Sequence, residues 1–203
     1  MKQITINYID TSELPNDYIE NAKIIFPYEW VNKIQRYKIE NDRRLSYCSF
    51  LFLFNYCKKN NISIWPKNWL ELIKKNKKFF SLAHSEKYCV FYEGKFKVGI
   101  DIEKIKKISK IISITKTNVF SQNEREIIEN SKDRLLSFLK IWGCKESYYK
   151  MFQKNYKNVI FNKSLSHAYV KNVFFNFDYL EDYLLTICSY QKDLFIEFKK
   201  IIM

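Results

Sequence analysis

Residues 98–103 read VGIDIE, a short apolar strand near the middle of the chain that carries two regularly spaced acids. Alternate side chains of a β-strand point to opposite faces of the sheet. Ile100 and Ile102 therefore face a core, while Asp101 and Glu103 share the other face. Two carboxylates at this spacing can hold one hard cation such as Mg²⁺. The ordinary alternative is a solvated strand face that happens to carry two acids.

A second segment, residues 142–150, reads WGCKESYYK and has the pattern of a helix. Side chains four residues apart stack on one helical face. Trp142, Glu146 and Lys150 therefore align as an aromatic ring, a carboxylate and an ammonium. The simpler interpretation is a surface Glu–Lys pair beside a core tryptophan.

The sequence around these segments alternates between strand and helix patterns. Apolar periodicity predicts strands at 3–9, 79–83, 87–92, 96–103, 168–176, 183–189 and 194–200. It predicts helices over most of 17–40, with a break near Pro27, and at 42–58, 105–113, 122–130 and 132–152. Glu93-Gly94 indicates a hairpin turn between the strands on either side of it.

Both halves of the chain run strand, helices, strands, which predicts an α+β fold built from two pseudo-duplicated halves. We place the boundary between residues 97 and 98. Residues 1–97 then form an N-terminal half and residues 98–203 a C-terminal half that carries both motifs. The active site is expected between the halves.

The composition suits a folded protein with an anionic partner. Of 203 residues 47% are apolar, which allows a sizeable core, and the formal net charge is +13. A basic surface favours nucleic acid, phosphorylated ligands, anionic membranes or acidic proteins. Part of the charge can instead reflect a bias of the whole sequence toward Lys, Asn, Ile, Tyr and Phe.

Compartment and redox chemistry follow from what the sequence lacks. No apolar stretch approaches the ~20 residues of a membrane span, and Met1–Thr5 does not resemble the start of a signal peptide, so we expect a cytoplasmic protein. The five cysteines are widely spaced and form no CxxC pair. We therefore expect buried thiols and no disulfide or zinc site.

The two motifs together resemble a known family. GIDIE, followed about 40 residues later by WxxKESxxK, is similar to the signature of the larger, Sfp-like 4'-phosphopantetheinyl transferases. Weaker resemblances follow the same order along the chain, over roughly residues 40–190. They are DRRLS at 42–46, FSLAHS at 80–85, FSxxE at 120–124 and YLLTIC at 183–188.

The resemblance implies an enzyme and its substrates. Such an enzyme transfers the 4'-phosphopantetheine group from coenzyme A to a serine of an apo acyl or peptidyl carrier protein. The transfer is Mg²⁺-dependent and releases 3',5'-adenosine bisphosphate. Because two halves in one chain can form the site between them, a monomer is expected. Neither nucleic acid nor a membrane is an expected partner.

The resemblance also assigns roles to residues. Mg²⁺ would be bound by Asp101, Glu103 and Glu146. Glu146 would also be the base for the carrier serine, and Lys150 would stabilise or protonate the leaving group. The resemblance and general phosphate chemistry imply contacts between coenzyme A and His84, Ser85, Lys145, Arg43 or Arg44, and Lys74 or Lys75.

The sequence departs from the family pattern at several positions. Leu45 replaces the last arginine of DRxRS, no GKP precedes the His-Ser segment, and residues 151–154 (MFQK) replace the usual glycines. The missing glycines keep a homologue without transfer activity open, while the charge, the aromatic residues and the carboxylates keep two other functions open. The three alternatives are a nucleic-acid-binding protein, a homologue that binds coenzyme A without transfer, and a metal-dependent hydrolase.

Overall fold

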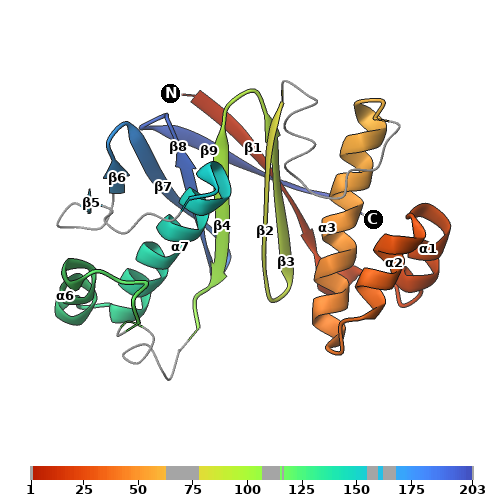
Figure 1. Ribbon diagram of the computed structural model, residues 1–203, viewed down its shortest axis with the longest axis horizontal. Helices are drawn as coiled ribbons and strands as arrows, with labels where there is room; N and C mark the ends of the chain where they lie inside the picture. The colour runs from red at the N-terminus through yellow and green to blue at the C-terminus, as the bar shows by residue number, and fades with distance from the viewer. Residues whose placement is uncertain are drawn as a thin grey trace.

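A computed structural model describes residues 2–62, 78–106, 115, 117–154, 160–161 and 168–202. The chain forms two β-sheets with helices packed against them, which confirms the α+β prediction (Figure 1). Strands β2 and β4, one from each sheet, lie next to each other at the centre of the molecule. The long helices α3 and α7 lie on either side of them.

The N-terminal half follows the predicted order of elements. It contains β1 (Lys2–Asp10), the 3-10 helix η1 (Thr11–Glu13), α1 (Tyr18–Ile25), α2 (Tyr28–Gln35), α3 (Glu40–Lys59), β2 (Phe79–Ser85) and β3 (Tyr88–Gly94). Pro27 lies between α1 and α2 as the N-cap of α2, since a proline at a helix start loses no hydrogen bond. The break predicted near Pro27 is therefore confirmed.

The C-terminal half contains β4 (Val98–Lys104), α6 (Gln122–Asn130), α7 (Arg134–Phe152), β5 (Ile160–Phe161), β6 (Ala168–Val170), β7 (Val173–Leu180), β8 (Tyr183–Ser189) and β9 (Leu194–Lys200). The strand predicted over 168–176 is in fact two strands, because the chain turns at Lys171, whose φ is +53°. Most of the predicted helix 105–113 lies outside the described residues.

The two sheets share a topology that confirms the pseudo-duplication. In the first sheet β3 pairs with β1 and β2, and in the second β8 pairs with β4 and β7; all four pairs are antiparallel. Each half therefore runs strand, long helix, hairpin, with the hairpin's second strand in the middle. The full strand orders are β2-β3-β1-β9 and β4-β8-β7-β6-β5.

Two pairings differ from the simple division of the chain. The predicted hairpin at Glu93-Gly94 is wrong, because β3 and β4 belong to different sheets, and the hairpin turn falls instead at Glu86-Lys87. Strand β9 pairs in parallel with β1 and so extends the first sheet. The boundary at 97/98 stays a prediction, and the pairing of β9 with β1 joins residues on either side of it.

Each long helix covers one face of its sheet, and a further core lies between the sheets. The buried face of α3 carries Leu45, Cys48, Phe52 and Tyr56, as its periodicity predicts. Phe52 stacks on Phe91 of β3 with ring centroids 5.0 Å apart. Side chains of this size contribute about 1.5–3 kcal/mol each when they are fully buried.

The core between the sheets fixes the orientation of β4. Ile100 and Ile102 pack into it, so Asp101 and Glu103 face the opposite side, toward α7. Two glycines allow α7 to lie close to the second sheet. A Cβ on Gly99 would lie 1.9 Å from the Ser147 carbonyl oxygen, and one on Gly143 would lie 2.4 Å from the Thr186 hydroxyl oxygen.

Two further expectations concern thiols and membranes. All five cysteines are buried and free, which confirms their assignment as core residues. Among the described residues, no helix combines the length and the apolar character needed to cross a bilayer.

Candidate active site

The seam between the two sheets is closed by serine side chains. The hydroxyl oxygens of Ser81 and Ser85 accept hydrogen bonds from the backbone N–H groups of Ile100 (3.0 Å) and Lys104 (3.3 Å). These two serines and Ala83 between them alternate with larger side chains along β2, so small residues face β4. This close approach brings the FSLAHS segment of one half beside the GIDIE segment of the other.

Asp101 lies at this seam with its carboxylate buried. One carboxylate oxygen accepts a hydrogen bond from the Lys150 ammonium at 2.7 Å, and the other is buried without a partner. Burial raises the pKa of Asp101 to about 6; the negative charge of Glu146 adds to this effect and the ammonium of Lys150 opposes it.

Glu103 is half-buried and is held at both oxygens. The indole N–H of Trp142 donates to Oε1 at 3.1 Å, and the hydroxyl of Ser85 donates to Oε2 at 3.3 Å. Burial raises the pKa of Glu103 to about 7, with a further contribution from the negative charge of Asp101. Burial and mutual repulsion therefore disfavour two negative charges on β4, and a cation bound between them would offset this.

Glu146 lies between these contacts on the same face of α7. Trp142, one turn earlier, reaches Glu103, and Lys150, one turn later, reaches Asp101. Since residues four apart share a helical face, Glu146 is turned toward β4. Its charge raises the pKa of Asp101, which is consistent with this placement.

The three acids have the chemistry of a magnesium site without being assembled into one. No three Asp, Glu, His or Cys side chains of the described residues converge as a ready-made metal cluster. In their place, the Lys150 ammonium occupies one oxygen of Asp101. The other oxygen of Asp101 is buried and unpartnered, and such an oxygen is the donor that a hard cation prefers. We conclude that these residues fit a divalent metal.

A cavity of about 230 Å³ opens between α2, α3 and β2, the strand that lies next to β4. Its polar and charged lining includes Lys33, Asp42, Ser46 and His84. His84 lines the cavity from the face of β2 opposite the serine seam. Desolvation by the cavity walls lowers the pKa of His84, and the positive charge of Lys150 lowers it further, against the opposing effect of Asp42. The charge of Lys150 therefore acts on the His84 wall of the cavity.

The other predicted basic residues of the N-terminal half are less directly placed. Arg43 and Arg44 both pair with Glu40, at 2.7 and 3.1 Å. Lys74 and Lys75 lie outside the described residues. Lys33, by contrast, lines the cavity and was not among the residues selected from the sequence. No local motif marks it, because its place depends on how α2 packs against α3.

Lys145 lies away from the site. Its ammonium is buried and forms an ion pair at 2.8 Å with the fully buried carboxylate of Glu124. Glu124 also completes the capping box of α6, where it accepts from the backbone N–H of Ser121 at 2.7 Å. The FSxxE segment thus starts α6, as its capping pattern indicates, and also links α6 to α7.

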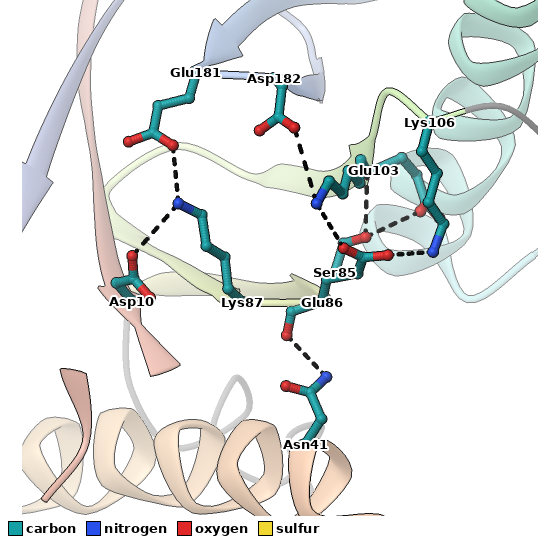
Figure 2. A network of polar contacts seen from close by, with 10 residues as sticks. Asp10, Asn41, Ser85, Glu86, Lys87, Glu103, Lys106, Glu181 and Asp182 are labelled. Atoms are coloured by element: carbon teal, nitrogen blue, oxygen red, sulfur yellow. Dashed lines mark hydrogen bonds and ion pairs between the residues drawn. The ribbon is translucent and has the colours of Figure 1, made fainter. Parts of the chain in front are cut away.

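Ion pairs join the two halves just beyond the Ser85–Glu103 contact (Figure 2). Each half contributes a hairpin tip, and both tips carry acids. Lys87 bonds Glu181 at 2.9 Å, while Lys104 bonds Glu86 at 2.9 Å and approaches Asp182 at 3.9 Å. These pairs tie the equivalent turns together at one end of the seam.

Comparison with known proteins addresses the half of the chain that carries the acids. A family model described as the 4'-phosphopantetheinyl transferase superfamily matches residues 97–189. This segment matches that superfamily. The 4'-phosphopantetheinyl transferase match begins just before β4 and ends with β8, so it covers the second sheet and helices α6 and α7. No individual curated protein matches the chain.

The superfamily match contains all three candidate metal-binding acids, together with Trp142 and Lys150. It supports phosphopantetheine transfer from coenzyme A to carrier proteins as the chemistry of this superfamily. The cavity, His84 and Ser85 lie in the N-terminal half, outside the matched residues.

Proposed function

We propose that this protein transfers 4'-phosphopantetheine from coenzyme A to a serine of an apo acyl or peptidyl carrier protein, with Mg²⁺, and releases 3',5'-adenosine bisphosphate. The observation that carries the proposal is the meeting of β4 and α7. Asp101 and Glu103 face the side of α7 that bears Glu146 and Lys150, inside the segment that matches the superfamily.

Asp101, Glu103 and Glu146 would hold the metal. Bound there, Mg²⁺ would neutralise charge on the pyrophosphate oxygens of coenzyme A. The unpartnered oxygen of Asp101 would provide one ligand. Oxygen ligands from two elements would tie β4 and α7 together at the point where coenzyme A must be positioned.

Glu146 is the best placed base for the incoming serine. A serine hydroxyl must lose its proton as the new bond forms, and a carboxylate within reach, directly or through one water, can accept it. Lys150 would serve the opposite end of the reaction. Its ammonium, now on Asp101, can move to the bridging oxygen of the leaving adenosine bisphosphate and stabilise the charge that develops there.

The cavity between α2, α3 and β2 would receive the nucleotide end of coenzyme A. Lys33 and His84 would offer N–H donors to the 3'-phosphate, and Ser85, the last residue of β2, donates a hydrogen bond to Glu103. The guanidinium groups of Arg43 and Arg44 would join them only after leaving Glu40. Lys145 takes no part in this version of the site because Glu124 holds it.

The duplicated topology within one chain favours the larger, Sfp-like type of transferase and a monomer. The net charge of +13 suits both the phosphates of coenzyme A and an acidic carrier surface, mainly by speeding association. We propose that the reaction takes place in the cytoplasm.

The test is incubation with several apo carrier proteins, coenzyme A and Mg²⁺, followed by intact-mass spectrometry of each carrier. A mass gain of one phosphopantetheinyl group, lost when the metal is chelated, would support the proposal. Coenzyme A binding with no modified carrier in the set would instead favour a non-catalytic homologue. The variant Glu146→Gln is the control, since it keeps the fold and loses the proposed base.

A further inference from the structure

Trp142 does more than fill space next to the acids. The residue lies on α7 and its ring is half-buried, parallel to the ring of Phe138 with centroids 6.4 Å apart and an interplanar angle of 12°. The ring of Phe120 lies against it at 6.4 Å. These neighbours hold the plane of the indole, so the direction of its N–H is fixed.

The indole N–H of Trp142 donates a hydrogen bond to the Glu103 carboxylate. An indole N–H can only donate, and here it donates to Oε1 at 3.1 Å. Ser85 donates to the other oxygen from the opposite half of the molecule. Both oxygens of the carboxylate thus accept hydrogen bonds from neutral donors. Trp142 of α7 and Ser85 of β2 together fix the plane of the carboxylate.

The contrast with Asp101 explains why neutral donors matter. Asp101 is paired with the ammonium of Lys150, which competes with any cation for the same charge. The donors to Glu103 carry no charge, so they orient the carboxylate and leave its negative charge available. Groups of this kind, one step removed from a metal, typically change metal affinity by about 10- to 100-fold when they are removed.

We propose that Trp142 is a positioning residue that aims the Glu103 carboxylate at a divalent metal through its indole N–H. The identity of that metal as Mg²⁺ rests on the proposed function. The hydrogen bond from Trp142 to Glu103 does not depend on it.

The test compares variants that remove the N–H and keep an aromatic ring. Trp142→Phe keeps a ring in the stack, and a tryptophan analogue with sulfur in place of the ring N–H keeps the full shape. Trp30→Phe is the matched control, because Trp30 stacks on Phe50 in the first half of the chain, in a core cluster separate from the acids. Metal binding is measured with Mn²⁺, by electron paramagnetic resonance of the free ion.

Both changes at Trp142 should weaken Mn²⁺ binding about tenfold, while Trp30→Phe leaves it within twofold of wild type. Excess metal should restore any transfer activity lost in the two Trp142 variants. Mn²⁺ affinity within twofold of wild type in the sulfur analogue would overturn the proposal, as would a wild-type protein that binds no Mn²⁺. Wild type that binds Mn²⁺ and loses it with the N–H, but modifies no carrier, would uphold the proposal and refute the transferase function.

Discussion

Adding one methyl group at Gly99 should separate the two halves of the candidate site. In Gly99→Ala the new Cβ would lie 1.9 Å from the carbonyl oxygen of Ser147 and 2.9 Å from the backbone nitrogen of Met151. Ordinary contacts begin at 3.4 Å, so α7 must retreat locally by 3.4 minus 1.9, or about 1.5 Å. Both obstructing atoms belong to the helix backbone, which cannot rotate away as a side chain can.

The retreat would move Glu146, the residue before Ser147, away from β4. A misplacement of about 1 Å in a catalytic arrangement can cost about 100-fold in rate. We therefore expect kcat/KM for carrier modification to fall by at least about 100-fold. Overpacking typically costs about 1–3 kcal/mol, so the variant should unfold at a lower urea concentration but remain folded in buffer.

The assay pairs carrier modification, followed by mass spectrometry, with urea unfolding followed by circular dichroism. Gly94→Ala is the control, because the three atoms nearest to a Cβ there all belong to the outer end of the Tyr92 side chain. It should keep nearly all of its transfer activity. A Gly99→Ala protein with wild-type kcat/KM and wild-type stability would refute the close contact between α7 and β4.

Three further predictions test other parts of the molecule. Glu146→Gln should reduce transfer to near background without changing the unfolding midpoint, and wild-type turnover in this variant would exclude Glu146 as the base. Lys145→Met should cost about 3–5 kcal/mol in urea unfolding, since it strands the buried Glu124 carboxylate, and the double change with Glu124→Leu should recover part of this loss. Burial raises the pKa of Cys57 from 9.0 to about 11, so the unfolded thiol ionises first as pH rises. The free energy of unfolding should therefore fall between pH 9 and 11, and a profile equally steep in Cys57→Ala would contradict this.

Much of the fold follows from local patterns, because local chemistry decides where elements begin. Helix α6 spans the predicted residues because Ser121 and Glu124 form a capping box. Helix α7 ends near the predicted residue although it lacks the glycine common at helix ends. Gln153 takes the left-handed conformation there, with φ of +56°.

Strand pairing was harder to predict, because paired strands can be far apart in the sequence. Glu93-Gly94 has the composition of a hairpin turn, yet β4 pairs with β8, which lies far along the chain. In the observed turn at Glu86-Lys87, Glu86 has a φ of +45°. Glutamate rarely adopts this conformation, so the local sequence does not predict a turn there.

The sequence predicted the residues of the candidate site that lie within its two motifs. It did not predict the positions that depend on another helix, α6 for Lys145 and α2 for Lys33. Helical spacing placed Glu146 and Lys150 together, and strand alternation paired Asp101 with Glu103. The same spacing could not show that Lys145 points to α6, since its partner depends on how the helices pack. Lys33 was missed for the same reason.

The parallel pairing of β9 with β1 joins residues from nearly opposite ends of the sequence. During synthesis β1 leaves the ribosome long before β9 has been made, so the edge of β1 that pairs with β9 stays open in the meantime. Completion of that sheet must wait until residues 194–200 have been synthesised. Such long-range contacts slow folding and leave a strand edge open to other chains. Yield in cells should therefore depend on chaperones that shield this edge while translation continues.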